Sequence, residues 1–179
     1  ATTTGHEIPH GRADLLDILK TYPVKNGAQF EEILVGLNGI SPRLYTIASS
    51  PAAHEGEVHI VVVKDTFIAN DKKRFGICSD FLSKLKLNST QQFFVQPNKR
   101  FRPPAENKDI IMVGPGTGIA AFRSFLAERD ATGASGRNWL FFGEQHFASD
   151  FLYQTEIQNW HETGVLTNIN LAFSRDQKE

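Results

Sequence analysis

The sequence contains almost no sulfur and no long apolar stretch. Of its 179 residues, one is methionine and one is cysteine, Cys78. A single cysteine excludes a disulfide within the chain and a zinc site built from several thiolates. No apolar run approaches the roughly 18 residues of a membrane-spanning helix, and there is no basic and then apolar leader. We therefore expect a cytoplasmic protein that does not enter a membrane.

The chain also lacks an excess of charge of either sign. It has 19 basic and 20 acidic residues, for a net charge of −1. Proteins that bind nucleic acid or membrane surfaces carry a basic patch, so we expect neither partner. Phenylalanine is the abundant aromatic residue, with 14 copies against two of tryptophan.

The first 40 residues predict little ordered structure beyond two short helices. His6 and His10 have a spacing that would suit a metal on a helix, but Pro9 and Gly11 disfavour a helix there, so we expect no metal site. Apolar periodicity predicts one amphipathic helix ending before Pro23. It predicts a second helix within residues 28–40, closed by Gly36 or Gly39.

The middle of the chain indicates strands. In residues 43–63, a pattern of alternating faces is followed by a run rich in β-branched side chains, and residues 91–104 predict one more strand and a turn with two prolines. Between them, a helix is expected to start near Ser79 or Asp80. The pattern changes at Asp109.

From Asp109 onward, segments typical of strands alternate with segments typical of helices. The strands are expected at residues 110–114, 138–143 and 168–173, with helices after the first and second. This order is the signature of a parallel sheet. The sequence thus predicts a β-rich antiparallel half followed by a parallel α/β half that is cut short, with a boundary at residues 103–108.

A glycine-rich turn follows the first strand of the parallel half, at Gly114, Gly116 and Gly118. Glycines allow a sharp turn and close approach to a ligand, and the following helix N-terminus favours an anion. The turn suits a dinucleotide pyrophosphate, although its spacing is not the usual G-x-G-x-x-G and a purely structural turn is the alternative. Arg123 is expected either to reach back to phosphate or to remain a solvated helix charge.

Ser174 and Arg175 follow the last strand, at the sheet edge where α/β proteins bind ligands. A guanidinium fork and a hydroxyl suit the 2′-phosphate of NADPH. Glu144, after the second strand, is the alternative, because a carboxylate there would bind the free 2′-hydroxyl of NADH. Its distance of 26 positions from Gly118 exceeds the usual spacing, which favours Arg175.

The β-rich half carries two weaker signals. Gly76 and Ser79 flank a helix start that suits a second anion, although an ordinary serine cap is the alternative. Arg43 and Tyr45, on one face of a strand, suit a phosphate beside a planar ring. The alternative is a surface arginine and a half-buried tyrosine.

Five motifs in this order resemble the ferredoxin–NADP reductase-like modules of diflavin reductases. They are RLYTIASS, GICS, GPGTGIAAFR, FFGEQHFASDFLY and AFSRDQ, within residues 41–179. The last two motifs are most similar to those of the flavoprotein subunits of NADPH-dependent sulfite reductases. The resemblance implies an antiparallel β-barrel FAD-binding domain over residues 41–104 and a truncated α/β NADP-binding domain over 105–179. Residues 1–40 would be a remnant of the connecting region.

The resemblance also implies the cofactor contacts. For FAD they are Arg43, Leu44, Tyr45, Thr46, Val61, Val62, Val63, Gly76, Ile77, Cys78 and Ser79. Thr46, where most relatives carry serine, would approach the flavin N5 and is the candidate catalytic residue. For NADPH they are Gly116, Thr117, Gly118, Arg123, Ser174 and Arg175.

The implied activity is hydride transfer from NADPH to FAD, with electrons passing on to FMN in a domain outside this chain and then to a hemoprotein subunit. Several flavin-side and NADPH-side residues of the family would lie beyond the Ser174–Arg175 motif. The alternatives are another diflavin or ferredoxin–NADP reductase-type enzyme, or a nucleotide-binding fragment without catalysis.

Overall fold

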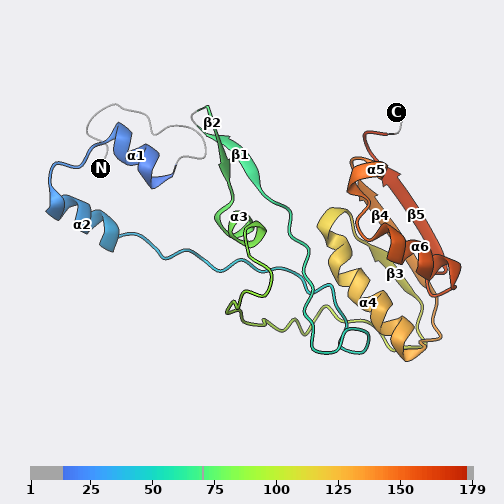
Figure 1. Cartoon of the computed structure of the whole chain (residues 1–179). Coiled ribbons are helices and arrows are strands. Elements are labelled where there is room, and N and C mark those ends of the chain that lie inside the picture. Colours follow the sequence, from blue (N-terminus) through green and yellow to red (C-terminus); the bar gives the residue numbers. More distant parts are fainter. Residues whose placement is uncertain (1–13, 70, 177–179) are drawn as a thin grey trace. The chain divides into compact units, whose positions relative to one another are not determined.

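The computed structural model describes residues 14–69 and 71–176, and they belong to two compact units (Figure 1). The described residues of the first unit lie within 1–43 and 64–86, and those of the second lie within 44–63 and 87–179. The predicted domain bounds stay a prediction. His6 and His10 lie outside the described residues.

The first unit begins with the two predicted helices, α1 (Leu15–Thr21) and α2 (Gly27–Val35). Asp14 caps α1 and Asn26 caps α2, each by accepting a hydrogen bond from a backbone N–H of the first turn. Such caps satisfy N–H groups that have no partner within the helix. Gly36 follows α2 as its C-cap, as expected.

A β-hairpin that we did not predict follows in the same unit. β1 (Thr66–Ala69) pairs with β2 (Lys72–Phe75) in antiparallel register. Asn and Asp separate the strands, and such residues favour the two-residue turns that join hairpins because they tolerate a positive φ. Asp71 indeed has a φ of 57°.

The next helix, α3 (Ile77–Ser83), starts two residues earlier than predicted. Gly76 is its N-cap, so Ser79 lies within the first turn and is buried. The Ser79 hydroxyl accepts a hydrogen bond from the Asp65 N–H at 3.1 Å and donates one to the Gly76 carbonyl at 3.2 Å. It therefore fixes the entry to α3 instead of capping it.

The prediction of strands throughout residues 43–63 is wrong. One isolated bridge, between Ile47 and Ile60, is the extent of strand pairing in this segment. The Ser49 hydroxyl donates to the Glu57 carbonyl and accepts from the His59 N–H, both at 3.1 Å. The Ser49 side chain thus makes hydrogen bonds to these two backbone groups that a neighbouring strand would otherwise make.

The strand predicted within residues 91–104 is also absent from the structure. The aromatic ring of Phe101 instead packs on α4, with ring centroids 6.0 Å from Phe122 and 5.4 Å from Phe125. Among the described residues, the antiparallel sheet therefore has two strands and does not form a closed barrel.

The second unit contains the predicted parallel sheet, in the order β3 (Ile110–Val113), β4 (Asn138–Glu144) and β5 (Asn168–Phe173). Along the chain, α4 (Ile119–Thr132) connects β3 to β4. α6 (Gln154–Glu162) lies in the connection from β4 to β5 (Figure 1). The alternating pattern from Asp109 onward is confirmed. In this arrangement the three strands end at the same edge of the sheet.

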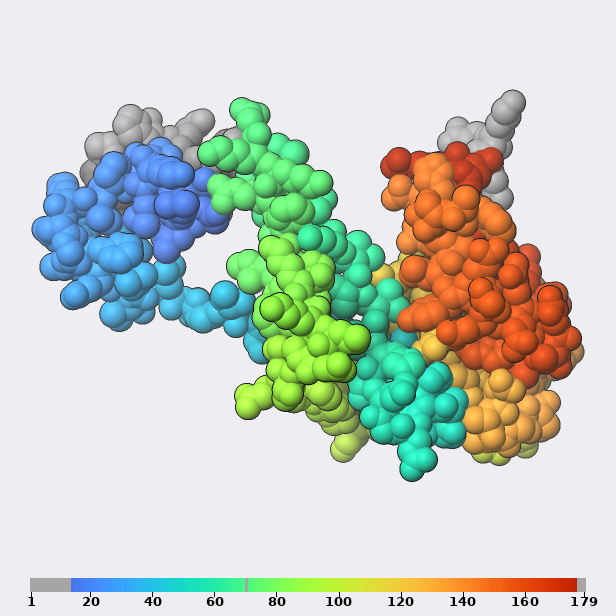
Figure 2. Space-filling view, in the orientation of Figure 1, coloured from blue at the N-terminus to red at the C-terminus, as the bar shows by residue number. Residues whose placement is uncertain are grey.

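Both helices cover one face of this sheet. Their apolar side chains and those of the strands form a single core of Met112, Ile119, Phe125, Leu126, Ala127, Leu140, Phe142, Ile157, Trp160, Leu166 and Phe173. Figure 2 shows α5 (Phe147–Asp150), α6 and β5 as one closely packed surface in orange and red. The opposite face of the sheet exposes Ile111, Val113, Trp139 and Leu171.

Candidate functional site

The glycines after β3 are required by the geometry of the turn. The sheet pairing continues to the Gly114 N–H, which donates to the Phe141 carbonyl at 3.0 Å. A Cβ at Gly114 would lie 2.6 Å from Cδ2 of Phe122. Gly116 has a φ of 54°, a conformation that glycine adopts without steric cost. A short 3₁₀ turn, η1 (Gly116–Gly118), then leads directly into α4 without a side-chain cap.

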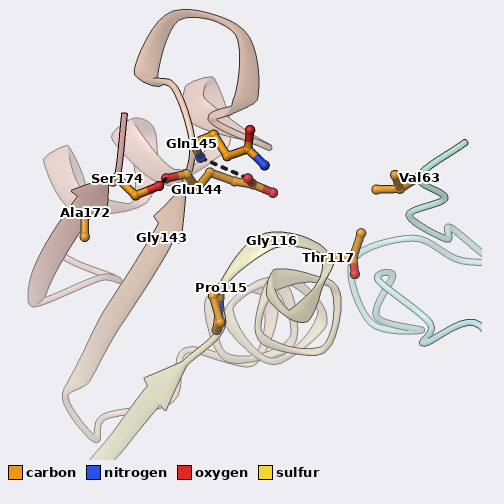
Figure 3. Close-up of a pocket in the computed structure, with 9 residues that line it drawn as sticks. All are labelled: Val63, Pro115, Gly116, Thr117, Gly143, Glu144, Gln145, Ala172 and Ser174. Carbon is orange, nitrogen blue, oxygen red and sulfur yellow. Dashed lines mark hydrogen bonds between the residues drawn. The ribbon is translucent and has the colours of Figure 1, made fainter. Parts of the chain in front are cut away.

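An open hollow of about 720 Å³ lies at this turn, within the second unit (Figure 3). Residues from the ends of all three parallel strands contribute to it. Its lining consists of Val63, Pro115, Gly116, Thr117, Gly143, Glu144, Gln145, Ala172 and Ser174. The carboxyl edge of a parallel sheet is the usual ligand-binding position in α/β folds.

The structure brings several of the predicted nucleotide contacts together here. Gly116, Thr117 and Ser174 line the hollow. Gly118 ends η1, whose first two residues are Gly116 and Thr117, but does not itself line the hollow. Arg175 follows Ser174 on an exposed loop, and its backbone N–H donates to the Gln145 carbonyl at 3.0 Å. The expected contacts of all these residues with NADPH stay predictions.

Asp176 fixes the loop that carries Ser174 and Arg175. Its carboxylate accepts a hydrogen bond from the Phe147 N–H at 2.6 Å and lies 2.8 Å from Nδ1 of His146. The backbone N–H of Phe147, and then His146, lower the pKa of Asp176 below its ordinary value. The charged carboxylate therefore ties the end of β5 to the start of α5.

Replacing Asp176 with Asn is expected to lower the thermal midpoint of the second unit by about 1–3 °C at pH 7. Because the folded-state pKa is depressed, this stabilisation is present above the unfolded pKa of about 3.9 and is lost as the pH falls through the folded value. The difference between wild type and variant is therefore expected to disappear in acid. Tryptophan fluorescence melts at pH 7, 5 and 3 measure it, and a constant difference would contradict a role for the ionised carboxylate.

Arg123 does not line the hollow but is buried, with 6% of its surface exposed. Its guanidinium makes a bidentate ion pair with Glu156 of α6, at 2.7 and 2.9 Å. It also donates to the Ala48 carbonyl at 2.8 Å and lies 2.9 Å from Nδ1 of His59. Arg123 thus joins α4, α6 and residues 44–63, and we call this set of contacts the arginine clamp. Its expected contact with the nucleotide stays a prediction.

Tyr153 covers the arginine clamp from one side. The Arg123 guanidinium carbon lies 4.6 Å from the centroid of the tyrosine ring, within the range of a cation–π contact. Burial raises the pKa of the Tyr153 hydroxyl, and the nearby Arg123 partly opposes this. Tyr153 has a φ of 58°, an uncommon conformation for a residue other than glycine, at the start of α6.

The residues predicted to bind flavin divide between the units. Arg43, Gly76, Ile77, Cys78 and Ser79 lie in the first unit, and Leu44, Tyr45, Thr46, Val61, Val62 and Val63 lie in the second. Tyr45 is half-buried, whereas Arg43, Leu44 and Thr46 are exposed. Their flavin contacts, and the catalytic role of Thr46, stay predictions.

Sequence reasoning expected Glu156 to have a structural role but missed most of the other polar framework around these sites. His59 of the arginine clamp, and the pair of His146 and Asp176, have partners far away in the chain. Glu144 was considered only as an alternative. In residues 14–69 and 71–176, no helix is both long and apolar enough to cross a membrane. The same residues contain no group of three or more His, Cys, Asp or Glu side chains placed to hold a metal ion.

Comparison with known proteins agrees with the site. Residues 112–179 match the family described as the oxidoreductase NAD-binding domain. The chain is 47% identical, over 169 residues, to the sulfite reductase [NADPH] flavoprotein alpha-component of Bacillus subtilis (strain 168), covering 93% of this chain and 28% of that protein. It is 46% identical over 171 residues to the protein of the same name from Vibrio vulnificus (strain CMCP6), covering 94% and 27%.

The predicted resemblance, which the motifs placed within residues 41–179, is therefore confirmed, and the similarity extends further, over 93–94% of the chain. The chain nevertheless spans only about a quarter of the length of these curated relatives.

Proposed function

We propose that this chain, with its oxidoreductase NAD-binding domain at residues 112–179, is the nucleotide-binding part of an NADPH-dependent flavoprotein reductase. The observation that carries the proposal is the hollow at the carboxyl edge of the parallel sheet. It combines a glycine turn leading into a helix with a serine from the neighbouring strand end. Backbone N–H groups at a helix start favour a phosphate, which suits the pyrophosphate of a dinucleotide.

In this proposal, Gly116, Thr117 and Gly118 hold the pyrophosphate of NADPH. Ser174 and Arg175 hold the 2′-phosphate, for which a hydroxyl and a guanidinium fork are suitable donors. A side chain at Gly116 would be strained and would lie 3.1 Å from Oε1 of Glu144, so the absence of a Cβ keeps the hollow open. The residues present therefore fit a dinucleotide.

We further propose that the chain contributes to an FAD site. Tyr45 would stack on the isoalloxazine ring, Arg43 would bind the FAD pyrophosphate, and Thr46 would lie near N5. The other proposed contacts are Leu44, Val61, Val62, Val63, Gly76, Ile77, Cys78 and Ser79. Residues 41–104 would form part of an antiparallel barrel in the complete protein, and residues 105–179 part of the NADP-binding domain.

The relatives suggest the wider reaction. NADPH would supply a hydride and FAD would accept it, while the protein provides binding, orientation and electrostatics. Electrons would then pass to FMN in a domain outside this chain and to a hemoprotein subunit, with sulfite as the final substrate. We place this activity in the cytoplasm. Another diflavin or ferredoxin–NADP reductase-type enzyme is the alternative, because the final electron acceptor would be bound outside this chain.

The flavin proposal is tested by the visible absorption spectrum of the full-length protein that contains this chain. We expect FAD among the flavins released on denaturation. Tyr45→Ala is expected to lower FAD affinity roughly fivefold or more, because a stacked aromatic pair contributes about 1 kcal/mol, whereas Tyr45→Phe keeps the ring and most of the affinity.

Equal FAD content in wild type, Tyr45→Ala and Tyr45→Phe would remove Tyr45 from the site. A folded protein that takes up neither FAD nor NADPH would instead indicate a nucleotide-binding fold without the reductase chemistry.

A further inference from the structure

Among the residues that the structure describes, Glu144 is the one charged residue in the lining of the hollow. It is the last residue of β4 and is half-buried, and its side chain extends toward the turn that holds Gly116 and Thr117 (Figure 3). Oε1 would lie 3.1 Å from a Cβ placed on Gly116. Oε2 accepts a hydrogen bond from the Gln145 N–H at 3.0 Å. A carboxylate is thus held inside a hollow whose other features favour anions.

The order of groups along the sheet edge gives this carboxylate a role. The glycine turn follows β3, Glu144 ends the central strand β4, and Ser174 follows β5. The Ser174 N–H donates to the Glu144 carbonyl at 2.9 Å, which fixes these two strand ends side by side. In NADPH, the adenosine ribose likewise lies between the pyrophosphate and the 2′-phosphate. The middle position on the edge therefore corresponds to the ribose.

Resting on the proposed function, we propose that Glu144 binds the adenosine ribose of the dinucleotide through its carboxylate. A carboxylate accepts hydrogen bonds and offers none, so it suits the ribose hydroxyls and not a phosphate. In NADPH the 3′-hydroxyl alone is free, and the adjacent 2′-phosphate brings a like charge toward the carboxylate. In NADH both hydroxyls are free. Glu144 is therefore a specificity-determining residue that favours the unphosphorylated ribose and reduces the preference for NADPH.

The predicted effect concerns the ratio of two affinities and can be measured without turnover. The probes are 2′,5′-ADP and 5′-ADP, which present the ribose with and without the 2′-phosphate. Isothermal titration gives Kd for each with the full-length flavoprotein. Glu144→Gln keeps the size of the side chain and removes the charge. We expect it to weaken 5′-ADP binding and to leave 2′,5′-ADP binding equal or tighter, so that the preference for 2′,5′-ADP rises at least fivefold.

Glu162→Gln is the matched control, because Glu162 is exposed at the far end of α6 and the same charge is removed. It is expected to leave both affinities unchanged. An unchanged or smaller preference in Glu144→Gln, with the wild type binding 2′,5′-ADP, would overturn the ribose role alone. A wild-type protein that binds neither probe would overturn the proposed NADPH function, and the ribose role with it.

Discussion

Replacing Glu156 with Ala is expected to lower the free energy of unfolding of the second unit by about 2–3 kcal/mol. The reason lies in its partner, since Arg123 would keep its buried position but lose both hydrogen bonds of the ion pair. Removing one partner of a buried pair leaves an uncompensated charge, which costs more than the pair itself contributed. The expected loss is below the largest known cases because the Glu156 side chain is 40% exposed.

Urea unfolding followed by tryptophan fluorescence suits this test, because both tryptophans of the chain, Trp139 and Trp160, lie in the second unit. Glu162→Ala is the matched control on the same helix and is expected to change the stability by less than about 0.5 kcal/mol. Equal midpoints for the two variants would show that the ion pair contributes nothing to folding.

The arginine clamp has a consequence for the proposed reaction. Residues 44–63 include Tyr45 and Thr46, the proposed flavin contacts, and they belong to the same unit as the nucleotide hollow. Arg123 holds this segment through the Ala48 carbonyl, and the Ser50 hydroxyl donates to Glu128 of α4. Arg123, a side chain expected from sequence to contact the nucleotide, thus connects two segments that we propose to bind cofactors.

The parallel sheet could be predicted from sequence because its signals are local. β3 and β4 are short and mostly apolar, β5 alternates asparagine with apolar residues, and the helices after the first and second strands have their own apolar periodicity. The glycine turn could also be predicted, because its geometry requires glycine. Gly116 has a positive φ, and Gly114 packs too closely on Phe122 for a larger residue. Strand–helix alternation then determines which ends of the strands meet, and hence where the hollow lies.

The segment 44–63 could not be predicted in the same way. Its alternating pattern is typical of a strand, but a strand also requires a neighbour with which to pair, and a single bridge is present here. The partners that hold it, Arg123 and Glu128, are about 75 residues away in sequence and carry no local signal. The hairpin of β1 and β2 was missed for a different reason, because its Asn-Asp turn was overlooked.

Replacing Arg175 with Ala is expected to weaken NADPH binding roughly ten- to 150-fold while leaving NADH binding nearly unchanged. A hydrogen bond to a charged group contributes about 1.5–3 kcal/mol, and only NADPH carries the 2′-phosphate that receives it. The position supports this selectivity, since Arg175 follows the serine that lines the hollow and is exposed, with its loop fixed by Asp176. Competition titrations of the full-length protein with NADPH and NADH measure both affinities.

Two further variants separate the phosphate contact from general electrostatics. Arg175→Lys keeps the charge but loses the planar fork, so it is expected to recover only part of the NADPH affinity. Arg100→Ala removes an exposed positive charge elsewhere in the second unit and is expected to change neither affinity more than about twofold. Equal losses for NADPH and NADH in Arg175→Ala would contradict the 2′-phosphate contact. They would then favour Glu144, at the end of the neighbouring strand, as the residue that determines which dinucleotide this site prefers.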